Sequence, residues 1–164
     1  MVVTKSRTMQ LTMPSDREVV LTRVFDAPRA LVFEAFTKPE HLRRWFGPRG
    51  FTLPVCEIDL RPGGAWNYVL RGPDGGEMGM RGVYREVVPP ERIVSTEAYD
   101  IPGMGWTPES VVTTTLDERN GKTTLTSRVL YQSIEHRDGH VNAGMEAGAS
   151  ETFDRLAELL AARV

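Results

Sequence analysis

Residues 144–160 read GMEAGASETFDRLAELL and predict one long amphipathic helix. The apolar side chains recur at helical spacing and therefore share one face. They are Met145, Ala149, Phe153, Leu156 and Leu160. The polar side chains on the other face are Glu146, Glu151, Asp154, Arg155 and Glu158. We expect the apolar face to pack against a sheet formed by the preceding strands.

Two glycines in this segment are costly for a helix. Gly144 and Gly148 each weaken it by about 1 kcal/mol relative to alanine. Together with Ala149 they leave a shallow patch beside an apolar face. Two interpretations stay open: a hollow beside Ala149, or close backbone packing against a neighbouring element.

Composition excludes several classes of protein. At 164 residues, with 40% hydrophobic and 26% charged residues, the chain predicts one globular domain. The net charge of −2 argues against a general nucleic-acid binder, because such proteins need a basic excess. No apolar run approaches the roughly 18 residues of a membrane span.

The cysteine count and the N-terminal segment predict a cytoplasmic location. With Cys56 as the only cysteine, no intramolecular disulfide can form, which suits a reducing compartment. Because Cys56 shares strand parity with Ile58 and Leu60, we interpret it as a buried apolar side chain. The first residues lack the apolar core of a signal peptide.

The order of predicted elements indicates the α+β class. Residues 1–16 predict a polar tail or a loose edge strand, and residues 17–164 a single domain. Short helices are expected at 28–36 and from 37 to about 45. Strands are expected at 18–25, 53–60, 65–72, 78–88, 92–99, 109–117 and 122–131. The short Gly/Pro/Asn turns between them join antiparallel neighbours.

Several sequence pieces, in order, carry a family resemblance. They are TRVFDAP (22–28), VFEAF (32–36), PEHL (39–42), WFGP (45–48), DLRPGGAW (59–66), GVYRE (82–86), PPER (89–92) and the segment from 144 to 160. Together, over about 18–161, they resemble the START-like (SRPBCC, Bet v 1-type) helix-grip superfamily. The branch is the one similar to the C-terminal domain of the activator of Hsp90 ATPase.

The resemblance implies a curved seven-stranded antiparallel sheet around the long C-terminal helix. Two short helices then lie between the first two strands, and a cavity lies between sheet and helix. Relatives often carry Trp or Met where this chain has Ala149, and Tyr where it has Phe153. We therefore expect a larger and less polar hollow at that point.

Ten residues are the candidates for lining the cavity. Trp66 and Tyr68 alternate on one strand, as do Met80 and Tyr84 on the next, so each pair faces one way. Trp106 lies with Met104 in a Gly/Pro-rich loop that is either a lid or a fixed loop. The full set is Trp45, Phe46, Trp66, Tyr68, Met80, Tyr84, Trp106, Met145, Ala149 and Phe153.

Catalytic and metal sites have little support in the sequence. No nucleophile motif is present, and whether Glu86 and Glu97 face inward is undetermined. His136 and His140 have i,i+4 spacing, but we expect Gly139 to break a helix there, so no metal site or cofactor is predicted. The basic cluster of His41, Arg43, Arg44 and Arg49 favours a solvated helix face over an anion site.

These observations leave three functions open. The first is binding or carriage of a small hydrophobic or aromatic molecule. The second is a cyclase- or hydrolase-type enzyme in the same cavity, which needs a polar pair such as Tyr with Glu or His inside it. The third is a chaperone-associated module, which we do not favour. The sequence leaves the enzyme question open but favours a non-enzymatic role, and a homodimer stays open.

Overall fold

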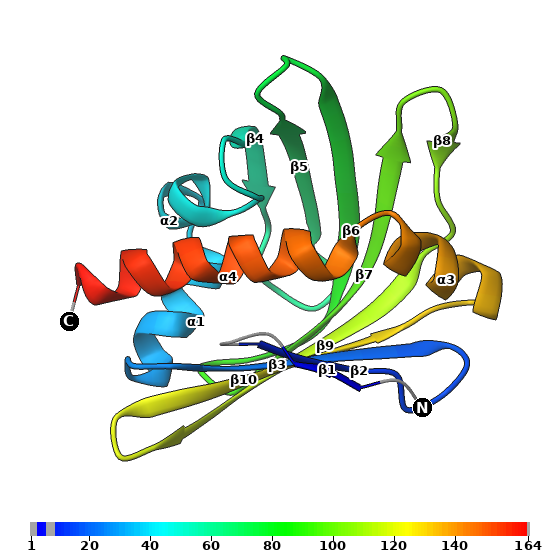
Figure 1. Ribbon diagram of the computed structural model, residues 1–164. Coiled ribbons are helices and arrows are strands. Elements are labelled where there is room, and N and C mark those ends of the chain that lie inside the picture. The colour runs from blue at the N-terminus through cyan, green and yellow to red at the C-terminus, as the bar shows by residue number, and fades with distance from the viewer. Residues whose placement is uncertain (1–2, 6–8, 164) are drawn as a thin grey trace.

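We analysed a computed structural model of the chain, which describes residues 3–5 and 9–163 and the side chains of 9–163. Part of the predicted tail, residues 1–2 and 6–8, lies outside the described residues, as does residue 164. The described part combines a large antiparallel sheet with helices, so the predicted α+β class is confirmed (Figure 1).

The strands form one antiparallel sheet in the order β1-β2-β3-β10-β9-β7-β6-β5-β4, with β8 pairing β7. The early strand β3 pairs with the late strand β10, which brings distant parts of the chain together. The strands are β1 Val3–Lys5, β2 Met9–Thr12, β3 Glu18–Phe25, β4 Thr52–Ile58, β5 Ala65–Arg71, β6 Glu77–Val88, β7 Arg92–Ile101, β8 Gly105–Trp106, β9 Ser110–Arg119 and β10 Lys122–Leu130.

The predicted number of seven strands is too low, because the described residues form ten. Two of the additional strands, β1 and β2, come from the N-terminal segment. Met9 and Leu11 of β2 are buried where β2 pairs with β3, so alternate apolar residues hold this segment on the sheet. The third, β8, is a two-residue strand folded back on β7.

Helix α4 (Met145–Ala161) is the predicted C-terminal helix, and the sheet bends around it (Figure 1). Its N-cap Gly144 has a φ of 90°, a left-handed conformation that favours glycine. Phe153, Leu156 and Leu160 are its buried side chains.

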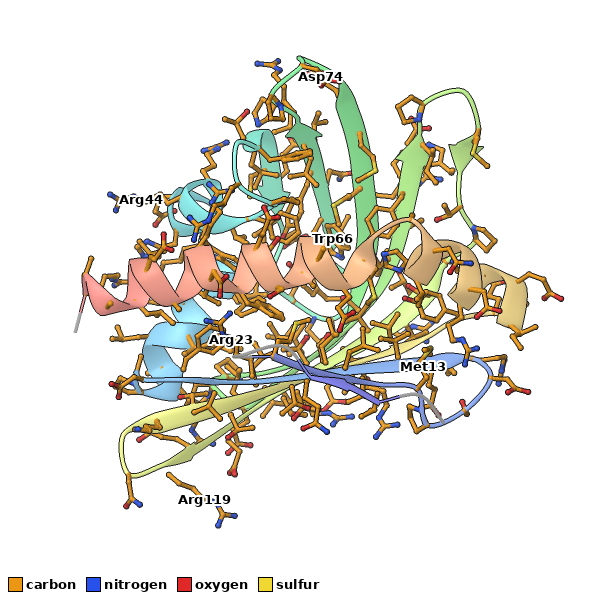
Figure 2. The ribbon with its side chains drawn as sticks, viewed as in Figure 1. Met13, Arg23, Arg44, Trp66, Asp74 and Arg119 are labelled. Atoms are coloured by element: carbon orange, nitrogen blue, oxygen red, sulfur yellow. The ribbon has the colours of Figure 1, made fainter. Side chains whose placement is uncertain are left out.

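An ion pair with a buried arginine and a partly exposed aspartate joins the middle of α4 to the sheet. Arg23 on β3, only 6% exposed, reaches toward α4 and donates to Asp154 at 2.6 Å (Figure 2). This contact and the apolar face fix the C-terminal half of the helix.

Helices α1 (Arg29–Thr37) and α2 (Pro39–Trp45) lie between β3 and β4, as predicted. A further helix, α3 (Ile134–Asn142), precedes α4 and runs through Gly139, so the expected helix break there is wrong. Ser133 explains why this helix forms, because its hydroxyl caps the helix by accepting from the backbone N–H of His136 at 3.0 Å. None of the helices described here is long and apolar enough to cross a membrane.

Inward and outward side chains alternate strictly along β5. Trp66, Tyr68 and Leu70 are buried, as predicted from their parity. Trp66 lies opposite Gly82 of β6, and a Cβ at Gly82 would meet the carbonyl oxygen of Thr96 and the indole of Trp66. The position therefore requires glycine for close packing.

We predict that Gly82→Ala lowers the free energy of unfolding by about 2–3 kcal/mol, because the new methyl group has no space. Gly139→Ala is the matched control, since a Cβ there meets no atom within 4 Å and the residue is helical. It should raise stability by about 0.5–1 kcal/mol. Urea unfolding measures both, and equal effects would contradict this account.

Candidate functional site

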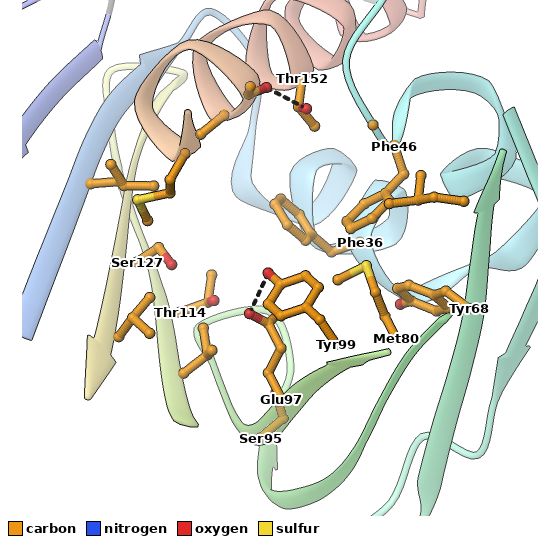
Figure 3. Close-up of a pocket in the computed structure, with 18 of the residues that line it drawn as sticks. Phe36, Phe46, Tyr68, Met80, Ser95, Glu97, Tyr99, Thr114, Ser127 and Thr152 are labelled. Carbon is orange, nitrogen blue, oxygen red and sulfur yellow. Dashed lines mark hydrogen bonds between the residues drawn. The ribbon is translucent and has the colours of Figure 1, made fainter. Parts of the chain in front are cut away.

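A cavity of about 370 Å³ lies between the sheet and α4 (Figure 3). Nine of the ten candidate residues line it. They are Trp45, Phe46, Trp66, Tyr68, Met80, Tyr84, Met145, Ala149 and Phe153. Gly148 and Thr152 line it as well, so the small residues of the first turns of α4 border open space. This favours the hollow over close backbone packing.

One end of the cavity is aromatic. Phe46 and Tyr68 pack edge to face with ring centroids 5.3 Å apart, and Tyr68 contacts Trp66 at 4.7 Å. Trp45 is fixed by its Nε1–H, which donates to the carbonyl of Ala35 at 3.0 Å. These rings form an apolar wall.

Trp106 does not line the cavity, contrary to the prediction. It is 41% exposed, and the guanidinium of Arg81 lies 3.9 Å from its ring centroid on the outward-facing side of β6. The reason is strand parity, because Arg81 alternates with the inward-facing Met80. The pairing of β8 with β7 and the contact of Trp106 with Arg81 both connect this loop to the sheet, while Met104 is 81% exposed.

Arg155 holds the segment that borders the cavity after α2. Its Nη1 donates to the carbonyls of Gly47 at 2.9 Å and Pro48 at 3.1 Å, and longer bonds reach Phe46 and Phe51. The sequence placed Arg155 on the polar face of the helix. The structure instead makes it a half-buried clamp on the segment that carries Phe46.

The other end of the cavity is polar. Ser95, Glu97 and Tyr99 alternate along β7 and line it. The Tyr99 hydroxyl donates to Oε1 of Glu97 at 2.8 Å (Figure 3). Burial raises the pKa of the Glu97 carboxyl, although the Tyr99 hydrogen bond opposes the shift. Burial, and secondarily Glu97, raise the pKa of Tyr99 well above its usual value.

The two glutamates that the sequence left undetermined thus face opposite ways. Glu86 lies outside the cavity and pairs with Arg92 at 3.0 Å. From the sequence, strand parity groups Glu97 with the residues on the same face of its strand. Parity does not reveal which face of a strand is buried, so it could not predict that Glu97 points inward.

His140 joins the polar end from α3. Burial, and secondarily His136, lower its pKa to about 4, so the ring is neutral near pH 7. A neutral ring accepts at only one nitrogen. The Tyr131 hydroxyl and Nδ1 lie 2.6 Å apart and share a hydrogen bond, whose direction depends on which ring nitrogen carries the hydrogen. The Tyr99 and His140 rings are 5.2 Å apart, so the two polar groups are neighbours.

The remaining sequence candidates lie elsewhere. Cys56 is buried, and burial raises its pKa to about 11, which favours the protonated thiol over the nucleophilic thiolate at neutral pH. Of the basic cluster His41, Arg43, Arg44 and Arg49, no member lines the cavity, and Arg49 pairs with Glu158. Within the described part of the chain, no cluster of His, Cys, Asp and Glu could hold a metal ion.

An antiparallel sheet that bends around a C-terminal helix is the architecture of the START-like helix-grip class, and the chain has it. The family model described as "Activator of Hsp90 ATPase homolog 1-like protein" matches residues 26–161, and the chain belongs to this family. The resemblance inferred from the sequence is therefore confirmed. The comparison with curated proteins found no match.

Solved structures of bacterial proteins are similar over nearly the whole chain. A Rhodobacter sphaeroides protein is 29% identical with a TM-score of 0.84, covering 94% of this chain and 98% of that one. A Nitrosomonas europaea protein is 26% identical with a TM-score of 0.81, covering 92% and 98%. Protein Ms6760 from Mycobacterium smegmatis is 25% identical with a TM-score of 0.82, covering 97% of each.

We predict that acid weakens the fold through His140. The unfolded chain protonates this side chain near its ordinary pKa of 6.5, whereas the folded protein resists protonation to about pH 4. Stability is therefore lost as the pH falls through this window, by about 3 kcal/mol. His140→Gln removes the titration and keeps an acceptor for Tyr131.

Urea unfolding from about pH 7 to about pH 4 tests this expectation. The advantage of the wild type over His140→Gln should shrink by about 3 kcal/mol. The opposite effect of the raised Glu97 pKa is present in both proteins and cancels in the difference. Parallel pH profiles would rule out a buried neutral His140.

We predict that Arg155→Met loosens the segment from Phe46 to Phe51, because its carbonyls lose a charged donor. The loss of stability should be about 2 kcal/mol, and hydrogen exchange should accelerate in this segment. Arg49→Met is the control, because its ion pair with Glu158 is exposed, and no measurable change is expected. Unchanged exchange in Arg155→Met would show that the clamp is unnecessary.

Proposed function

We propose that the protein binds a small, largely apolar molecule in the cavity between the sheet and α4. The observation that carries this proposal is the hollow that remains beside Gly148 and Ala149, where the helix has no large side chain to fill it. At about 370 Å³ the cavity falls within the range of about 300–1,000 Å³ typical of ligand pockets. Membership of a START-like family is consistent with this kind of domain.

The composition of the walls supports the same proposal. Aromatic and methionine side chains give adaptable apolar contact area. A small set of polar groups at the opposite end, Glu97, Tyr99 and His140 among them, can orient a ligand. A pocket that is apolar at one end and polar at the other suits an amphiphilic molecule.

A second candidate function is an acid–base enzyme in the same cavity. The condition for it was a polar pair inside the pocket, and Tyr99 with Glu97 meets that condition. A carboxyl group with a raised pKa is a suitable general base, and the neutral His140 ring offers one donor and one acceptor nitrogen. Mass spectrometry of the small molecule after incubation with the protein distinguishes the two functions. A chemically changed ligand indicates catalysis, and an unchanged ligand indicates carriage.

The chaperone-associated alternative rests on the description of the family model. It calls for a docking surface, whereas the features described above converge on an internal cavity. We expect this protein to give no stimulation in an Hsp90 ATPase assay, and stimulation would favour the alternative.

We expect native mass spectrometry with a panel of hydrophobic compounds to detect adducts of the wild type. Ala149→Trp should abolish them, because the indole would occupy the hollow. Ala147→Trp is the matched control on the exposed side of the same helix and should bind like the wild type. The proposal fails if no compound gives an adduct or a thermal shift, or if Ala149→Trp binds normally.

A further inference from the structure

We propose that the molecule bound in this cavity carries a protonated amine attached to an apolar body. The inference rests on the proposed ligand-binding function and assigns the chemical class of the ligand. It follows from the charges, the hydrogen-bond acceptors and the aromatic rings that the cavity presents.

The charges that line the cavity are of one sign. Among the residues whose side chains the structure describes, Glu97 is the only acidic one in the lining, and neither Lys nor Arg lines the cavity. His140 adds no positive charge near pH 7, because burial lowers its pKa and keeps the ring neutral. A carboxylate or phosphate ligand would find no counterion and would face Glu97.

Glu97 also has no cationic partner within the part of the chain that the structure describes. Its described side-chain contact is the hydrogen bond that Oε1 accepts from the Tyr99 hydroxyl at 2.8 Å, while Oε2 has no partner. The described ion pairs all involve other carboxylates. Burial disfavours the ionised form of Glu97 and so raises its pKa, whereas a bound ammonium group would stabilise the carboxylate and offset the cost of its burial.

Further acceptors lie on the same wall. The hydroxyls of Ser95, Thr114 and Ser127 line the cavity near Glu97 and make no side-chain hydrogen bond to the described residues (Figure 3). An ammonium group donates three hydrogen bonds and accepts none. Oε2 of Glu97 and these hydroxyl oxygens therefore complement it.

Aromatic rings complete the match. Figure 3 shows Tyr99 beside Glu97, with Phe36 and Phe46 farther along the space. Ring faces attract cations, and the attraction grows when the site is shielded from water. The same rings provide apolar contact for the body of the ligand.

Isothermal titration calorimetry with three matched compounds tests the proposal. Phenylbutylamine, phenylbutanol and phenylbutyrate share one apolar body and differ in the charge of the head group. We expect the wild type to bind the amine about tenfold or more tightly than the alcohol, because its hydrogen bonds are charge-assisted. We expect the carboxylate to bind more weakly than either.

Glu97→Gln keeps the shape of the side chain and removes its charge. The variant should lose the preference for the amine while its affinity for the alcohol stays within about twofold. Glu86→Gln is the control, because Glu86 pairs with Arg92 outside the cavity, and it should bind all three compounds like the wild type. If Glu97→Gln fails to fold, the affinities of the wild type for the three compounds still test the amine assignment.

The outcomes separate this inference from the proposed function. Binding of the alcohol as tightly as the amine, tight binding of the carboxylate, or an unchanged preference in Glu97→Gln overturns the amine assignment and leaves the cavity proposal intact. Absence of binding by all three compounds also overturns the amine assignment. The adduct panel with Ala149→Trp then decides separately whether the cavity binds any ligand.

Discussion

Burial of one half of α4 against the curved sheet determines the rest of this structure. Phe153, Leu156 and Leu160 fix the C-terminal half, and Phe153 packs edge to face on Phe25 of β3 with ring centroids 6.0 Å apart. The N-terminal half, with Gly148 and Ala149, borders the cavity instead. A straight helix contacts a bent sheet along only part of its length, so a helix anchored at one end leaves space at the other.

Two arginines, one on the sheet and one on the helix, hold α4 in its position over the sheet. Arg23 reaches from the sheet to Asp154, and Arg155 reaches from the helix to the carbonyls after α2. Each guanidinium thereby joins α4 to a segment distant in sequence. These contacts connect α4 to two of the segments around the hollow.

The cavity also separates two kinds of chemistry. Trp66 and Tyr68 on β5 contribute to the aromatic end, whereas Glu97 and Tyr99 on β7 contribute to the polar end. These two strands, separated in the sheet by β6, thus present different side chains to the same space. Under the proposed function, this arrangement would orient a ligand with its apolar part toward the aromatic end and its polar part toward Glu97.

The sequence alone determined the family and most local elements, α3 and the additional strands excepted, because helical periodicity, strand parity and turn residues are properties of neighbours along the chain. It also indicated Trp66, Tyr68, Met80 and Ala149 as cavity residues, since parity and side-chain size are local. It did not locate the polar end.

Only the tertiary structure decided that Glu97 faces inward, that His140 from a separate helix lies beside Tyr99, and that Trp106 packs outside on Arg81. Each of these depends on which face of a strand is covered, or on which distant element lies opposite. The pairing of β3 with β10 and the path of α4 across the sheet set those relations, and both join residues far apart in the sequence.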